Sequence, residues 1–143
     1  MRSHAELYVH LVWATWDRAP WLVPEARPAV YRCISEQARR LEAEVIAVGG
    51  VADHVHVLAR FPARIAVSDL VKNLKGASSR HANADLHLAR PFRWQGAYGA
   101  FSVSRRSLGP VEAYIANQER HHADGTLIRV LELTAAAPEP TRT

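Results

Sequence analysis

Two imidazoles lie one residue apart in this sequence, in a short run that is otherwise mostly apolar. They are His54 and His56, within residues 53–58. Side chains alternate between the two faces of a β-strand, so both rings would project from the same face. Imidazole is a common metal ligand, and the pattern therefore predicts a pair of metal ligands. The alternative is a pair of histidines satisfied by hydrogen bonds on a half-exposed sheet face.

A second segment offers a nucleophile and a candidate third ligand. Tyr114 and Gln118 are four residues apart in a stretch with helical character, and residues at this spacing lie one above the other on a helix. A tyrosine hydroxyl can act as a nucleophile, and an amide oxygen can bind a cation. Taken alone, Tyr114 also fits core packing with its hydroxyl at the surface, and Gln118 alone is uninformative.

The composition is that of an ordinary globular protein. Of the 143 residues, 48% are apolar and 22% are charged. No apolar run approaches the roughly 20 residues of a membrane span. The single cysteine, Cys33, excludes an internal disulfide and a multi-cysteine zinc site. We expect a buried thiol there, no association with membranes, and a location in the reducing cytoplasm.

The net charge of +4 is unevenly distributed along the chain. Residues 60–107 contain nine Lys or Arg against two Asp, whereas the flanking parts are slightly acidic. A concentrated basic block indicates a polyanionic partner, most often nucleic acid, although a solvated basic surface would give the same count. The basic residues are Arg60, Arg64, Lys72, Lys75, Arg80, Arg90, Arg93, Arg105 and Arg106.

The hydrophobic pattern predicts strands and helices in the order β-α-β-β-α-β-α. This order is typical of an α+β, ferredoxin-like (RRM-like) antiparallel sheet with two helices on one face. The last helix, which carries Tyr114, is an addition to that fold. Gly49 and Gly50 are expected to form a turn or bulge. The predicted strands cover 7–15, 45–48, 55–61 and 98–103, and the predicted helices cover about 25–44, 66–83 and 107–122.

The chain length suits a single domain, which we place at residues 1–133. Within it, residues 126–133 are expected to form a short strand or a helical turn. Residues 134–143 contain two prolines and little that could be buried. A disordered tail is therefore expected there.

Four segments, in their order along the chain, resemble the small single-tyrosine HUH transposases of bacterial insertion sequences. This is the IS200 type, or transposase A, within the superfamily of REP-associated tyrosine transposases. HUH denotes two histidines around a hydrophobic residue, here His54 and His56. The resemblance spans about residues 7–131 and includes the first strand. The segments are 52–58, 74–80, 94–104 and 114–122.

The resemblance implies metal-dependent DNA transposition. Tyr114 would attack a phosphodiester of single-stranded DNA, leaving a 5′-phosphotyrosine and a free 3′-hydroxyl. His54, His56 and Gln118 would hold Mg²⁺ or Mn²⁺. The resemblance also implies recognition of DNA hairpins at the ends of an insertion element. It further implies a homodimer whose subunits share active sites.

Under the same resemblance, the basic block and nearby aromatic residues would contact DNA. Trp94 and Tyr98 would stack on unpaired bases, with packing between loop and sheet as the alternative. Asp53 has two interpretations: its side chain lies on the strand face opposite His54, or the residue shapes the start of the strand. His10, His121 and His122 are expected to be structural or DNA-contacting rather than ligands. The candidate phosphate contacts are Lys72, Lys75, Arg80, Arg105 and Arg106. Ser79, on the same predicted helix face as Lys72 and Lys75, is a further candidate DNA contact.

Other functions stay open on the sequence alone. A domesticated HUH nickase acting on repeated palindromes, or a replication-initiation nuclease, would share the Tyr114 chemistry and differ in target. A ferredoxin-like nucleic-acid-binding module without catalysis would use the basic block and not the tyrosine. A histidine-rich metal-binding protein would use only the imidazoles.

Overall fold

A four-stranded sheet carries helices on both faces in the computed structural model, which describes residues 3–125, 132 and 134. The expected element at 126–133 and the expected tail therefore lie outside the described residues, apart from Glu132 and Thr134. The strands and helices are β1 (Tyr8–Ala14), η1 (Trp16–Arg18), α1 (Arg27–Arg40), β2 (Glu44–Val51), β3 (His54–Arg60), α2 (Val67–Asp85), β4 (Gly99–Val103), η2 (Arg105–Ser107), α3 (Leu108–Ala116) and α4 (Gln118–Asp124).

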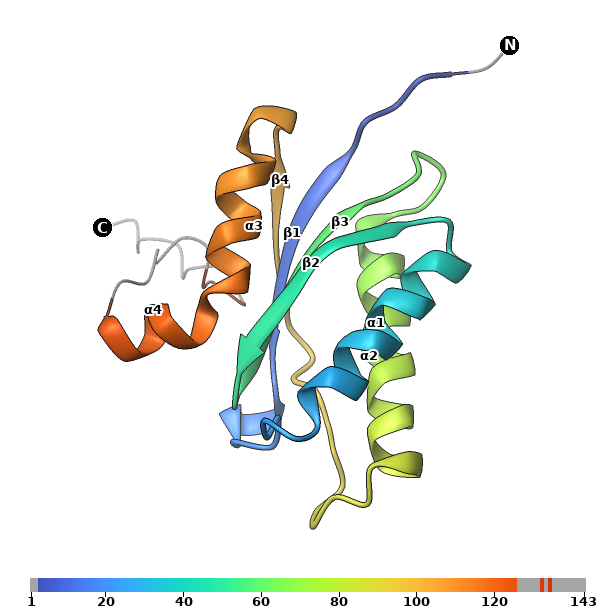
Figure 1. Cartoon of the computed structure of the whole chain (residues 1–143). Helices are drawn as coiled ribbons and strands as arrows, with labels where there is room; N and C mark the ends of the chain where they lie inside the picture. The colour runs from blue at the N-terminus through green and yellow to red at the C-terminus, as the bar shows by residue number, and fades with distance from the viewer. Residues whose placement is uncertain (1–2, 126–131, 133, 135–143) are drawn as a thin grey trace, which may run out of the picture.

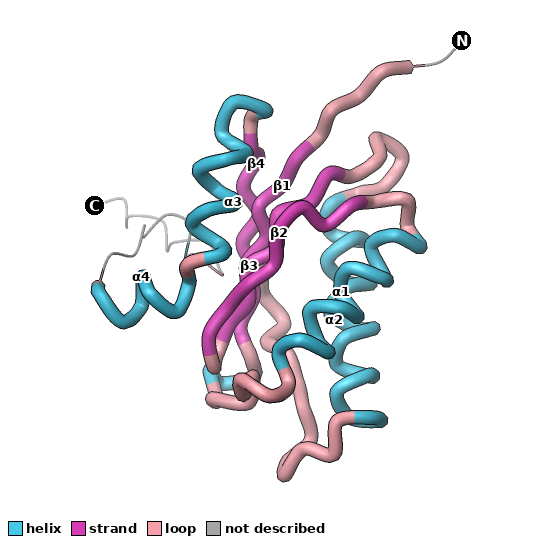
Figure 2. Tube along the Cα trace, viewed as in Figure 1, coloured by secondary structure: helices cyan, strands magenta, loops and turns pink. Residues whose placement is uncertain are grey.

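The sheet topology confirms the predicted fold class. The strand order is β2-β3-β1-β4, and every neighbouring pair is antiparallel. Helices α1 and α2 pack together on one face, and α3 crosses the other (Figures 1 and 2). This is the ferredoxin-like arrangement with one helical addition. Among the described residues, no helix is both long and apolar enough to cross a membrane.

Alternation along the strands decides which side chains face which helices. In β3, Val55 and Val57 enter the core shared with α1 and α2, so His54 and His56 lie on the opposite face, toward α3. Strand β1 follows the same rule and places His10 on the α3 face. Each buried valine contributes about 1.5–3 kcal/mol. A one-residue slip of β3 would move both imidazoles into the apolar core, so packing fixes the register.

Two adjacent glycines lie inside a strand, so the prediction of a turn or bulge at this point is wrong. Gly49 and Gly50 belong to β2 and pair with His56 and Val55, and the chain turns at residues 52–53 instead. A β-carbon on Gly49 would lie 2.5 Å from the carbonyl oxygen of Ile115 in α3. Glycine is required here because the helix backbone approaches the strand so closely.

The predicted last helix is divided into two. Asn117 separates α3 from α4 with backbone angles of φ −107° and ψ 25°. This break re-aims the chain between Tyr114 and Gln118. The four-residue spacing of these two side chains is therefore not that of one continuous helix.

Candidate functional site

The two predicted imidazole ligands are buried side by side beneath α3. His56 is fully buried and His54 is 3% exposed, and their ring centroids are 5.2 Å apart. On this face each imidazole has one small and one larger cross-strand neighbour: Ala14 and Val51 lie opposite His54, and Gly49 and Val12 lie opposite His56. The small neighbours, Ala14 and Gly49, add little bulk beside the rings.

Tyr114 reaches the same place from α3. It is 4% exposed, and its ring meets His56 edge-on with 6.0 Å between centroids. It also stacks on the ring of His121, with 4.6 Å between centroids. The structure therefore brings the predicted nucleophile and the predicted imidazoles together within one chain.

Gln118 is also buried, at the first residue of α4. Its Nε2 donates a hydrogen bond to the backbone oxygen of Tyr114 at 3.3 Å. Its Oε1 is buried and has no hydrogen-bond partner among the described residues. A buried amide oxygen without a donor is costly unless something binds it.

Glu132 completes the site, and the sequence reasoning missed it. One carboxylate oxygen lies 2.9 Å from Nε2 of His54 and 3.0 Å from Nε2 of His56. The other accepts a hydrogen bond from the Tyr114 hydroxyl at 2.5 Å. The ligand atoms of His54, His56 and Glu132 all lie within 4.8 Å of one another. A lone glutamate in the C-terminal stretch carries no motif that would have identified it.

The charges at the site are balanced by hydrogen bonds. Burial alone would raise the pKa of Glu132, but hydrogen bonds from His54 and His56 outweigh it and hold that pKa well below its usual range. Burial lowers the pKa of His54, yet its bonds to Glu132 and Asp53 outweigh this and raise it overall. For His56, burial prevails and its pKa is lowered. His54 is therefore the imidazole that holds a second proton more readily.

Further residues orient the imidazoles from behind. Asp53 accepts a hydrogen bond from Nδ1 of His54 at 2.7 Å, which aims Nε2 into the site. His10 contacts Nδ1 of His56 at 2.8 Å. His122 places its Nε2 3.2 Å from Nε2 of His54, at the margin of the site.

The donor set suits a divalent cation. Two imidazole nitrogens and one carboxylate oxygen, all within 4.8 Å of one another, are a mixed set that Mn²⁺ accepts readily and Mg²⁺ can share. The unpartnered Oε1 of Gln118 is the specific observation that fits a bound ion.

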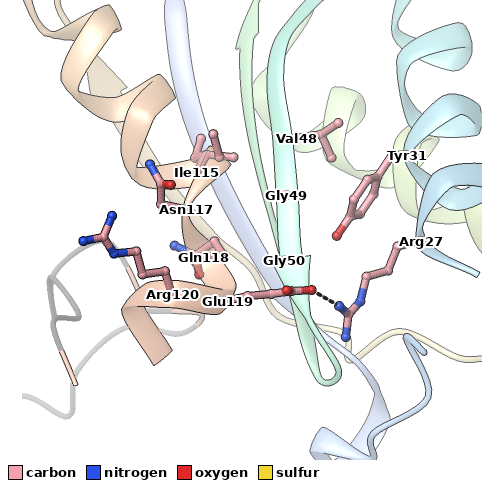
Figure 3. A pocket seen from close by; sticks show the side chains of 11 residues that line it. Arg27, Tyr31, Val48, Gly49, Gly50, Ile115, Asn117, Gln118, Glu119 and Arg120 are labelled. Atoms are coloured by element: carbon pink, nitrogen blue, oxygen red, sulfur yellow. Dashed lines mark hydrogen bonds and ion pairs between the residues drawn. The ribbon is translucent and has the colours of Figure 1, made fainter. Parts of the chain in front are cut away.

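A pocket of about 390 Å³ lies at the open edge of β2, beside Gln118 (Figure 3). Gly49 and Gly50 line it from the strand, and Tyr31 lines it from α1. Burial raises the pKa of Tyr31 to about 12, so its hydroxyl stays protonated. An ion pair between Arg27 and Glu119 closes one side and ties α1 to α4.

The predicted DNA contacts are spread over several surfaces. Lys72, Lys75 and Tyr98 share a pocket of about 210 Å³ between α2 and the segment before β4. Arg80 lines a separate pocket with Cys33 of α1. Cys33 is only half-buried, in contrast to the buried thiol expected from the sequence. Ser79 bonds to the backbone oxygen of Gly76, and Arg105 and Arg106 are exposed just before α3.

Trp94 is the exception among these residues. Only 6% of it is exposed, its ring packs against Trp13 and Phe92, and its indole N–H donates to Ser78. Trp94 therefore packs between the loop and the sheet, which was the alternative to stacking on DNA. Its buried ring has no free face for a base in this structure.

The sequence is similar to known transposases. Residues 3–118 match the family described as "Transposase IS200 like", a range that includes Tyr114 and Gln118 and ends before Glu132. The ISDra2 transposase TnpA of Deinococcus radiodurans is 30% identical over 118 residues, which cover 79% of this chain and 84% of that protein.

Solved structures share the fold. The crystal structure of a protein from Deinococcus radiodurans R1 that is described as a transposase matches with a TM-score of 0.65 and 31% identity. The match covers 82% of this chain and 98% of that chain. A REP-associated tyrosine transposase bound to a REP hairpin matches with a TM-score of 0.63 over 89% of this chain and 74% of that chain. Its identity of 13% shows the fold alone.

Proposed function

Because the chain belongs to the IS200-like transposase family, we propose that it cleaves and rejoins single-stranded DNA at hairpin-marked element ends. The observation that carries the proposal is the convergence of Tyr114, His54 and His56 on one carboxylate within one chain. The hairpin bound by the REP-associated transposase supports a hairpin substrate.

Tyr114 supplies the covalent chemistry. Its phenol oxygen forms a bond to phosphorus while the bond from phosphorus to the 3′-oxygen breaks, and that oxygen takes a proton to become a free 3′-hydroxyl. The product is a 5′-phosphotyrosine. A 3′-hydroxyl from another end then attacks the same phosphorus and restores the phenol, so rejoining needs no external energy source.

The phenol needs help to react at neutral pH, because the unperturbed pKa of tyrosine is about 10. Oε1 of Glu132 already accepts the hydrogen bond of the Tyr114 hydroxyl. This contact orients the oxygen and gives its proton an acceptor. Stacking on His121 fixes the ring from the other side.

His54, His56 and Gln118 would hold a Mg²⁺ or Mn²⁺ ion, which polarises the scissile phosphate and stabilises the leaving oxygen when it is bound. The unpartnered oxygen of Gln118 supports this role. Glu132 adds a carboxylate to the set. Nitrogen ligation favours Mn²⁺ in affinity.

The DNA would reach the site along basic surfaces. Lys72 and Lys75 with Tyr98 offer charge and one aromatic ring at the edge of the sheet, and Arg105 and Arg106 offer charge at the start of α3. We also infer a homodimer, as the family resemblance implies.

The decisive experiment uses labelled single-stranded hairpins made from the DNA that flanks the coding region. Incubation with Mn²⁺ and denaturing electrophoresis should show protein-linked DNA. The linked band should disappear with Tyr114→Phe and with a chelator, while hairpin binding persists. The matched control is Tyr8→Phe, since Tyr8 lies in β1 outside the site.

Other results would redirect the assignment. A linked band that survives Tyr114→Phe would remove the nucleophile. Binding without any linked product would favour a non-catalytic nucleic-acid-binding module. Cleavage without joining of a second end would indicate a domesticated nickase.

A further inference from the structure

His10 lies directly behind the site, and the mechanism above does not use it. It is fully buried in β1, and its Nε2 lies 2.8 Å from Nδ1 of His56. The two rings are stacked with 5.1 Å between centroids. The other nitrogen of His10, Nδ1, is buried without a hydrogen-bond partner among the described residues.

This geometry excludes His10 from the ligand set. His56 turns its Nε2 toward Glu132, at 3.0 Å, so Nε2 is the nitrogen that faces a cation. His10 contacts the opposite nitrogen of the same ring. It therefore acts on the site only through His56.

The hydrogen bonds of His56 depend on which nitrogen carries the proton. As a donor to the Glu132 carboxylate, His56 has its proton on Nε2, and Nδ1 must accept from Nε2–H of His10. As the ligand of a cation, His56 needs a lone pair on Nε2 and carries its proton on Nδ1. His10 must then accept instead of donate.

We propose that His10 is a positioning residue that sets the tautomer of His56, accepting the Nδ1–H of His56 when His56 binds a divalent cation. In the change, one proton crosses the bond between the two rings. Another leaves Nε2 of His56 for water, and one from water is taken up on the unpartnered Nδ1 of His10, so that the pair neither gains nor loses a proton overall. Each ring stays neutral, so the pair gains no charge in a buried place.

Only a side chain that can both donate and accept satisfies both arrangements. His54 shows the contrast, since its Nδ1 faces the acceptor-only carboxylate of Asp53 at 2.7 Å. Asp53 fixes the orientation of His54 in every state. The site thus holds one imidazole with a fixed partner and one with an adaptable partner.

The inference rests on the proposed function only in taking His56 as a cation ligand. The experiment titrates purified protein with Mn²⁺ by calorimetry, without DNA. His10→Met fills similar volume but cannot pair with His56, and we expect Mn²⁺ to bind about 10- to 100-fold more weakly. His10→Gln can accept or donate and should bind nearly as the wild type does. Phe101→Leu is the packing control, because the ring of Phe101 lies beside the ring of His10, with 6.0 Å between centroids, and the phenylalanine side chain has no hydrogen-bonding group.

The outcomes separate the two ideas. If His10→Met bound Mn²⁺ as tightly as the wild type, or if His10→Met and His10→Gln lost the same Mn²⁺ affinity, the proposed role of His10 would be wrong. The proposed cation site would still stand. Absence of Mn²⁺ binding by the wild type would overturn the cation site as well. Thermal unfolding shows whether each variant is folded.

A second measurement needs no variant. In wild-type protein with ¹⁵N-labelled histidine, addition of diamagnetic Mg²⁺ should move the protonated nitrogen of both His10 and His56 from Nε2 to Nδ1. A spectrum in which either ring keeps its proton on Nε2 after Mg²⁺ binds would contradict the proposal.

Discussion

At the scale of residues, Glu132 has the most contacts in the site and the least signal in the sequence. Its two oxygens join His54, His56 and the Tyr114 hydroxyl, and it is partly buried with a side-chain exposure of 15%. A carboxylate between two imidazoles and a phenol can serve as a ligand, but it also stands where a phosphate must approach. These two roles have opposite consequences for its removal.

We expect Glu132→Gln to weaken Mn²⁺ binding about tenfold or more, because an anionic ligand is replaced by a neutral amide of the same shape. The amount of protein-linked DNA should also fall when the Mn²⁺ concentration is limiting. Calorimetry and the hairpin-linkage gel measure the two effects.

Glu6→Gln is the matched control, because Glu6 lies outside the site and faces Arg105. Faster cleavage by Glu132→Gln at unchanged Mn²⁺ affinity would show instead that the carboxylate obstructs the phosphate.

Local sequence patterns predict only those candidate side chains that lie close together along the chain. His54 and His56 follow from alternation in a strand, and Tyr114 follows from the helix and the family resemblance. His10 and Glu132 act through contacts across 46 and 76 residues of sequence with His56. No spacing rule connects positions that far apart, because only the strand register and the return of the chain bring them together.

At the scale of elements, the position of α3 depends on one close approach. Gly49 in β2 meets the backbone of Ile115, the residue next to Tyr114. The pair Arg27–Glu119 ties α4 to α1 on the far side of the pocket. The glycine pair resembles a turn signal in sequence, and the break at Asn117 has no Gly or Pro to announce it. Both depend on packing between elements rather than on local propensity.

Gly49→Ala should displace α3, because a β-carbon 2.5 Å from a carbonyl oxygen forces the helix backbone to move. We expect a stability loss of about 1–3 kcal/mol and a large loss of covalent product, with hairpin binding retained. Denaturant unfolding and the linkage gel measure these effects.

The control is Gly109→Ala in α3, where a β-carbon meets nothing within 4 Å. That change should leave stability equal or slightly raised, since alanine favours a helix over glycine. If the Gly49→Ala protein formed as much protein-linked DNA as the wild type, catalysis would not depend on the close packing of α3 against Gly49.

At the scale of the whole molecule, the sheet separates the two imidazoles from two of the predicted DNA contacts. The imidazoles face α3, whereas Lys72 and Lys75 belong to α2 on the opposite side. Charge counting along the sequence finds the basic block but cannot tell these sides apart. DNA that touches both would have to pass around one edge of the sheet, and Tyr98 lies with the two lysines in the pocket beside the start of β4.

The last question at this scale is whether one chain builds a whole site. The resemblance implies subunits that share active sites, but in this chain Tyr114 meets its own His56. We therefore expect a mixture of Tyr114→Phe and His56→Ala proteins to form no linked DNA, because every cis site lacks one essential group. Mixing wild type with Tyr114→Phe controls for exchange of subunits and should give product in proportion to the wild type. Product from the doubly defective mixture would show that the tyrosine of one subunit serves the imidazoles of another, and that α3 leaves the position beside Gly49 when two chains associate.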